Sequence, residues 1–220
     1  MSVALVALAA GYLLGAVPTA HLVARSRGRS VFDVGSGSMG AMNVARNLGM
    51  GPGLLVLAID VGKGALATYL GLLMMRIEGA GGDPLGTAAL LPPLLAGAGA
   101  VTGHCFSAYV SFRGGQGLAT ALGAALPLYP YPALYAIVLI VALVLIFRRS
   151  EVAILITLGL YPVVTLLALE RQGWPREATF LVTTVVVIMC LIGLVRQLAN
   201  RRVRRRASRD LSPAGGPEGS

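Results

Sequence analysis

The sequence predicts an all-α integral membrane protein, a bundle of about seven transmembrane helices with short or broken spans and Gly-rich cytoplasmic loops. Of its 220 residues, 56% are hydrophobic and 12% are charged, whereas a soluble domain carries roughly 25% charged residues. The 29 glycines suit helices that pack closely in lipid, because small residues let backbones approach one another. Several apolar stretches also approach the length of about 20 residues that a helix needs to cross a bilayer.

Six apolar stretches are the candidate spans. The first lacks both a basic N-terminal region and a later small-residue cleavage site, so it is predicted to be a retained span rather than a signal peptide. A seventh stretch, residues 118–131, is too short for an ordinary span and too apolar for a surface loop, which indicates a short tilted helix before a Pro-rich turn. The six candidates are residues 3–24, 53–75, 85–102, 133–147, 152–169 and 178–195.

The basic residues favour seven spans over six. With seven spans and the N-terminus outside, fourteen Arg residues face the cytoplasm and three face outward, as the positive-inside rule requires. Six spans would place the Arg-rich C-terminal tail and the loop at residues 25–50 on opposite faces. We therefore expect one polytopic membrane domain, residues 1–200, and an Arg-rich, disordered cytoplasmic tail, residues 201–220. Its position directly after a span favours contact with anionic lipid over nucleic acid.

The first polar interruption is the loop DVGSGSMGAMNVARNLG, residues 33–49. Its glycines permit turns whose consecutive N–H groups form an anion-binding nest, and a helix beginning near Gly40 would aim its positive end at the same place. A candidate phosphate site is the functional interpretation; a flexible connector is the alternative. The side chains available to an anion are Ser36, Ser38, Asn43 and Arg46.

Asp60 and Lys63 interrupt the second apolar span. A charge near the bilayer centre costs about 2.5–3.5 kcal/mol on insertion scales. Their spacing puts both residues on one helix face, where they partly neutralise each other. Lys63 is the only lysine in the chain, which makes it a candidate anion ligand; a structural ion pair between helices is the alternative.

The third interruption is GHCFSAYVSFRGGQGLAT, residues 103–120. Its glycines open the backbone beside Arg113, and His104 lies at a span end as either a catalytic or a structural group. No second His, Cys or carboxylate stands at ligand spacing, so no metal and no cofactor is predicted. The chain has neither a Gly-x-Ser-x-Gly elbow nor an Asp five positions from a His, so neither an acyl-enzyme nor a His–carboxylate pair is expected. Two Gly-rich loops beside lipid suit a substrate with a phosphate and an acyl chain.

The three interruptions resemble the motifs of the bacterial acyl-phosphate:glycerol-3-phosphate acyltransferase (PlsY) family. That family's first motif reads approximately GSGNPGATNVxRxxG, and this chain has GSGSMGAMNVARNLG at residues 35–49. The second, DVxKG, is DVGKG at residues 60–64, and the third, GHxFPxFxxFxGGKGVAT, is matched at residues 103–120. Order and separation agree, and the resemblance covers residues 12–120.

The resemblance implies a seven-helix enzyme of the bacterial cell membrane with its motifs on the cytoplasmic side. This agrees with the charge count, which places the N-terminus outside and the C-terminus in the cytoplasm. Such an acyltransferase passes a fatty acyl group from acyl phosphate to the 1-hydroxyl of glycerol 3-phosphate, giving lysophosphatidic acid and phosphate in the first step of phospholipid synthesis. Its partners are these two substrates and membrane lipids, without nucleic acid or a cofactor. The oligomeric state is left open, with a monomer as one option.

Carried onto this sequence, the resemblance also implies a set of site residues. The expected catalytic residues grip phosphate or position groups in the cleft, and the expected substrate-binding residues add side-chain and backbone donors. The catalytic set is Ser36, Arg46, Lys63 and His104. The substrate-binding set is Ser38, Asn43, Gly103, Arg113, Gly114, Gly115, Gln116 and Gly117.

The chain departs from the family pattern at several positions. Gln116 stands where the family has Lys, Ser38 and Met39 stand where it has Asn and Pro, and of its C-terminal motif only Asn200 is recognisable. A lost cation at a phosphate site weakens stabilisation of the transition state. The alternative function is therefore a non-catalytic or altered paralogue, or a transporter, that binds anionic lipid or a phosphorylated solute.

Overall fold

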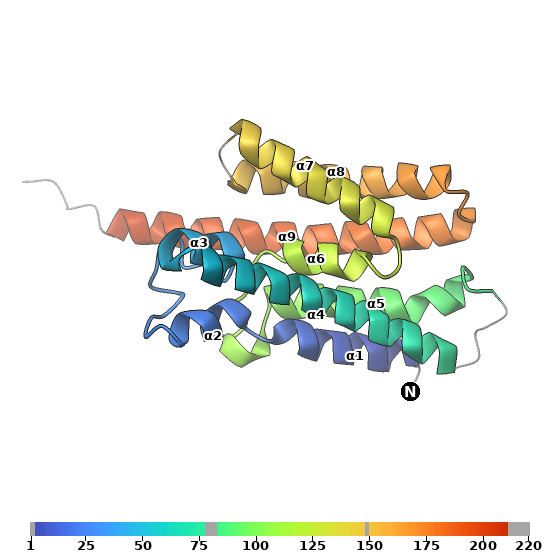
Figure 1. Ribbon diagram of the computed structural model, residues 1–220, viewed down its shortest axis with the longest axis horizontal. Helices are drawn as coiled ribbons and strands as arrows, with labels where there is room; N and C mark the ends of the chain where they lie inside the picture. The colour runs from blue at the N-terminus through green and yellow to red at the C-terminus, as the bar shows by residue number, and fades with distance from the viewer. Residues whose placement is uncertain (1–2, 78–82, 148–149, 211–220) are drawn as a thin grey trace, which may run out of the picture.

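The computed structural model describes residues 3–77, 83–147 and 150–210, and within these ranges its regular secondary structure is helical, without strands. The helices lie roughly along one long axis (Figure 1), so the predicted fold class, an all-α membrane bundle, is confirmed. The helices are α1 Val3–Ala16, α2 Thr19–Arg25, α3 Ala41–Leu48, α4 Met50–Ile77, α5 Thr87–Cys105, α6 Leu118–Ala125, α7 Pro130–Phe147, α8 Ser150–Arg171 and α9 Arg176–Asp210, with a 3₁₀ turn at Ala108–Val110.

The predicted count of about seven spans becomes six long segments and one short helix. Within the described residues, six helical segments are long and apolar enough to cross a membrane. The seventh stretch forms α6, which has only eight residues and is followed by a turn into α7. The chain therefore reverses direction once more, and the start of α1 and the C-terminal end of α9 lie at opposite ends of the long axis (Figure 1).

The first predicted span is broken into α1 and α2 at Val17 and Pro18. Proline lacks an N–H and its ring clashes with the carbonyl group of the preceding turn, which kinks or breaks a helix. The break makes the carbonyl groups of Ala16 and Val17 available to side chains of other helices, namely Ser107 and Lys63.

Small residues allow the close packing of α1 and α4 against α5, the most buried of the candidate spans. A Cβ on Gly15 would overlap the backbone of Ala100, and one on Gly103 would overlap the backbone of Tyr12. Gly103 is therefore required for contact between α1 and α5. Large apolar side chains such as Val138 and Leu145 of α7 are exposed, as expected for surfaces that face lipid.

The C-terminal helix extends beyond the predicted membrane domain. The sequence predicts a disordered tail from residue 201, whereas α9 continues to Asp210. Arg and Ala are favourable helix residues, and extending an existing helix requires no new nucleus. The rest of that predicted tail, residues 211–220, lies outside the described residues.

Candidate active site

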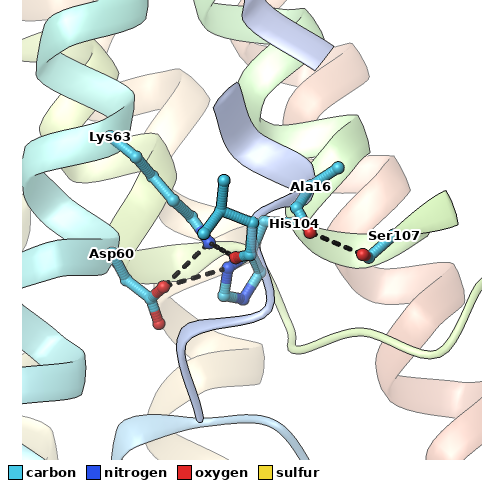
Figure 2. Close-up of polar contacts among 6 residues, drawn as sticks. Ala16, Asp60, Lys63, His104 and Ser107 are labelled. Atoms are coloured by element: carbon cyan, nitrogen blue, oxygen red, sulfur yellow. Dashed lines mark hydrogen bonds and ion pairs between the residues drawn. The ribbon is translucent and has the colours of Figure 1, made fainter. Parts of the chain in front are cut away.

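The Asp60–Lys63 pair lies in the middle of a buried polar cluster between α4, α5 and the α1–α2 break. The Lys63 ammonium lies 2.8 Å from Asp60 Oδ1 and donates a hydrogen bond to the Val17 carbonyl oxygen at 3.2 Å (Figure 2). Only 2% of Asp60 and 8% of Lys63 is exposed. The prediction that the two charges share one helix face is confirmed.

His104 joins this cluster from the last turn of α5. Its Nδ1 lies 3.6 Å from Asp60 Oδ1 (Figure 2), and 7% of the residue is exposed. The expectation that no His–carboxylate pair exists is wrong, because the carboxylate comes from another helix more than 40 positions away. A search for an Asp close to His104 in the sequence could not find this partner.

A small cavity lies beside the cluster. It is lined by Met39 of the first loop, by Asp60, Lys63, His104 and Ser107, and by the α1–α2 break. Its size leaves room for about one water molecule. An ammonium group has three N–H donors, and Asp60 and Val17 take two of those on Lys63. Among the described residues no third acceptor contacts the Lys63 ammonium, which leaves one donor for a bound group.

The segment after α5 is tied to α1 by two long-range hydrogen bonds. Ser107 Oγ donates to the Ala16 carbonyl oxygen at 2.5 Å (Figure 2), and Tyr12 Oη donates to the Phe106 carbonyl oxygen at 2.9 Å. These bonds fix the place from which the third motif crosses the end of the bundle.

The Gly-Gly-Gln-Gly segment, residues 114–117, folds back over His104. The Gly115 N–H donates to the His104 carbonyl oxygen at 3.1 Å, and a Cβ on Gly115 would overlap the His104 ring. Gly117 has φ 80° and is the N-cap of α6. This left-handed conformation favours glycine, so the segment requires glycine for two different reasons.

Two backbone donors of this segment have no hydrogen-bond partner among the described residues. Among the described residues, no protein acceptor receives the N–H of Gln116 or Gly117. They precede the first turn of α6, whose N–H groups also lack helical partners. Such a helix start attracts anions, so residues 116–118 are a candidate site for a phosphate.

The first Gly-rich loop is organised by Asn43, which is 7% exposed. Its Oδ1 accepts the Ser36 N–H at 2.8 Å, and its Nδ2 donates to the carbonyl oxygens of Ser38 and Val34 at 3.0 and 3.2 Å. Gly40 is the N-cap of α3, as predicted for a helix that begins near it. Asn43 thus shapes the loop with both ends of its amide.

The two predicted arginines lie at the surface. The Arg113 guanidinium lies 5.1 Å from the centre of the Phe32 ring, which joins the third motif to the first loop. Arg46 is exposed at the end of α3, and no hydrogen bond or ion pair to it is found among the described residues.

Gln116 lies at the edge of an apolar crevice between α6, α8 and α9, which is also lined by Tyr161, Met189 and Cys190.

Sequence reasoning omitted two residues from the site, Asp60 and Arg196. Asp60 was identified only as the partner of Lys63. Arg196 is one of the fourteen arginines predicted to face the cytoplasm, and its place directly after the last apolar stretch gives no sign of a contact with the third motif.

All three motif segments therefore meet at one end of a helical membrane bundle, around buried charges and unpaired backbone donors. These features define a membrane protein with a candidate anion site at its polar end. The site has no group of three or more His, Cys, Asp or Glu side chains able to hold a metal ion within the described ranges.

The chain belongs to the glycerol-3-phosphate acyltransferase family, whose model matches residues 5–205. It is 39% identical over 185 residues to glycerol-3-phosphate acyltransferase 1 of Deinococcus radiodurans, covering 84% of this chain and 86% of that protein. It is 38% identical over 186 residues to a glycerol-3-phosphate acyltransferase of Thermus thermophilus, covering 84% of this chain and 87% of that protein.

Two crystal structures of PlsY, an integral membrane glycerol 3-phosphate acyltransferase, have the same fold. The glycerol 3-phosphate form superposes with a TM-score of 0.71 at 26% identity and covers 99% of this chain and 96% of its own. The lysophosphatidic acid form gives a TM-score of 0.70 at 26% identity, and the match covers 93% of this chain and 94% of that chain. The resemblance inferred from the three motifs is confirmed.

Proposed function

We propose that this chain is a glycerol-3-phosphate acyltransferase that uses acyl phosphate as its donor and releases lysophosphatidic acid and phosphate. The observation that carries the proposal is the meeting of three separate motif segments at one polar end of an apolar bundle. Family membership and the glycerol 3-phosphate and lysophosphatidic acid forms of PlsY support the acceptor and the lipid product.

The donor phosphate binds at the start of α6. The N–H groups of Gln116 and Gly117 point to this role because no described acceptor takes them. As the acyl–oxygen bond breaks, negative charge grows on the leaving phosphate. Fixed backbone donors stabilise such charge without reorganising during the reaction. Gly114 and Gly115 support this site by shaping the turn rather than by direct contact.

Glycerol 3-phosphate binds between the first loop and the Lys63 cluster. Lys63 has one donor left after Asp60 and Val17, and Arg46 adds an exposed forked cation suited to phosphate. Ser36 and Ser38 belong to the same loop, which Asn43 holds in shape. Arg113 closes the loop against the third motif through Phe32.

The reaction is a direct transfer between the two bound substrates. The 1-hydroxyl oxygen of glycerol 3-phosphate attacks the acyl carbonyl carbon and forms the new ester bond. The bond from that carbon to the phosphate oxygen breaks, phosphate leaves with the electron pair, and a phosphate oxygen takes the hydroxyl proton. Because the donor is already activated, holding the two groups in reactive geometry provides much of the acceleration.

His104 acts mainly as a positioning group in this scheme. Its Nδ1 faces Asp60 and its other ring nitrogen packs against Gly115, so the ring transmits the position of α4 to the phosphate-binding turn. Lys63 likewise joins α4 to the α1–α2 break, through its hydrogen bond to the Val17 carbonyl oxygen.

The polar end of the bundle faces the cytoplasm of a bacterial cell in this proposal. The end that carries α2, α3 and the C-terminal end of α9 (Figure 1) also carries Arg25, Arg27, Arg29, Arg46 and Arg196, and basic residues accumulate on the cytoplasmic side of membranes. The N-terminus then lies outside, and the charged substrates reach the site from the cytoplasm.

The test is turnover by the purified protein in detergent or lipid nanodiscs. Palmitoyl phosphate and glycerol 3-phosphate should give lysophosphatidic acid and phosphate in equal amounts, and palmitoyl-CoA should not replace the donor. If neither the native protein nor its Gln116→Lys variant forms product, the proposal is wrong. Binding of glycerol 3-phosphate without turnover in both would instead support a non-catalytic paralogue.

A further inference from the structure

The phosphate-binding turn is held by a residue of the last helix, Arg196 of α9. Its Nε and Nη2 both donate to the Gly114 carbonyl oxygen, at 3.3 and 3.2 Å. The two residues are 82 positions apart, so this contact brings the end of the chain to the third motif. Hydrogen bonds from a charged donor are stronger than neutral ones.

The contact fixes one complete peptide unit. The Gly114 carbonyl accepts from Arg196, and the N–H of the same peptide unit, which belongs to Gly115, donates to the His104 carbonyl oxygen. A planar peptide held at both ends cannot rotate about its flanking bonds. Because the next two residues, Gln116 and Gly117, supply the proposed phosphate donors, this peptide determines where those donors point.

Arg196 is itself held in place. Its guanidinium carbon lies 5.7 Å from the centre of the Phe106 ring, and the residue is half-buried. Gly193 lets α9 approach the turn closely, because a Cβ there would lie 2.9 Å from the Gln116 carbonyl oxygen. Two positions one turn apart on α9 thus contact the same turn.

We propose that Arg196 is a positioning residue of the donor site, which orients the Gln116 and Gly117 N–H groups by holding the Gly114–Gly115 peptide. The inference rests on the proposed function. Arg196 also brings a positive charge to a turn whose own arginine, Arg113, faces Phe32 instead. Loss of the contact therefore impairs binding of the acyl phosphate and leaves binding of glycerol 3-phosphate intact.

The test compares Arg196→Gln and Arg196→Lys with Arg176→Gln. Arg176 is exposed at the start of α9, so its variant removes the same charge from the same helix far from the turn. Arg196→Gln should raise the KM for acyl phosphate at least about tenfold, as expected for the loss of a charged hydrogen bond, with the KM for glycerol 3-phosphate changed by less than about twofold. Arg196→Lys should fall between, and Arg176→Gln should match the native protein.

A double-mutant cycle with Phe106→Leu separates positioning from general damage. Phe106→Leu alone should raise the KM for acyl phosphate about threefold, the scale of a cation–π contact, and should add nothing in the Arg196→Gln background. The inference would be overturned if the effects of the two substitutions on the KM for acyl phosphate were additive. It would also be overturned by equal rises in both KM values with a lower melting temperature, which would show that Arg196 only stabilises the fold. An unchanged KM for acyl phosphate would overturn it as well. If the native protein itself makes no lysophosphatidic acid, the proposed function fails, and this inference fails with it.

Discussion

The two Gly-rich segments of the site differ in what holds them. The first loop is ordered mainly by Asn43, whose bonds reach Val34, Ser36 and Ser38, at most nine positions away. The third motif is held by partners far along the chain: Phe106 and Ser107 bond to α1 across more than 90 positions, and Gly114 bonds to Arg196 across 82. The first loop is held by hydrogen bonds within itself, whereas the third motif is held by hydrogen bonds to distant helices.

This difference predicts separate consequences for the two substrates. Damage within the first loop should remain local and affect glycerol 3-phosphate, since only that loop changes shape. Damage to the long-range contacts should reach the donor site and also the stability of the bundle, because the same contacts join the segment after α5 to α1 and α9.

The largest effect is expected when the buried charge cluster is broken. Lys63→Met leaves Asp60 buried with only His104 beside it, and breaking a buried ion pair costs about 3–5 kcal/mol. The free energy of unfolding in detergent should fall by that amount, and lysophosphatidic acid formation should be lost.

The control for this variant is the double change Asp60→Asn with Lys63→Met, which removes both charges. The double variant should recover a large part of the stability but no activity. A Lys63→Met protein as stable as the native one would show that the pair does not join the helices.

Asn43→Ala is the matching change in the first loop, and its effect should be smaller. Removing the amide leaves the Ser36 N–H and two carbonyl oxygens without their partner, which costs about 1–3 kcal/mol for buried groups. The KM for glycerol 3-phosphate should rise, while the KM for acyl phosphate should stay the same. Steady-state kinetics with each substrate varied in turn measures both, and an equal rise in the two constants would contradict the comparison.

The same contrast explains what the sequence could predict. The Asp60–Lys63 pair and the helix start at Gly40 depend on residues within one or two turns, so spacing alone indicates them. The pairing of His104 with Asp60, the break that exposes Val17, and the contact of Arg196 with Gly114 depend on which helices pack together. No local pattern encodes that packing.

The fold was predictable for a similar reason. Apolar stretches and the uneven distribution of arginine determine the spans without knowledge of their neighbours. The short α6 was also indicated, because residues 118–131 are apolar but end in prolines. The division of the first span was not predicted, although Pro18 provides its cause.

Arg46→Ala should have a kinetic effect with almost no structural one. Arg46 is exposed, and surface substitutions usually change stability by no more than about 0.5 kcal/mol. The KM for glycerol 3-phosphate should rise, and the rise should shrink at high salt because exposed charges are screened. Titration of phosphate-ligand binding at low and high salt checks this; unchanged affinity would remove Arg46 from the site.

The smallest effect is expected for Gln116→Lys. A lysine at this position adds a cation beside the donor turn, at the edge of the crevice between α6, α8 and α9. The value of kcat/KM for acyl phosphate should increase a few-fold, with the melting temperature unchanged. A decrease would indicate that the neutral side chain belongs to the way this turn binds its anion.

The most direct test of the account is initial-rate kinetics with both substrates varied. Because the two phosphates bind to different segments that meet at one place, both substrates must be bound together before the acyl group moves. Double-reciprocal plots should therefore intersect, and product phosphate should compete with acyl phosphate. Parallel lines, the pattern of a covalent acyl-enzyme, would contradict the direct transfer proposed for this site.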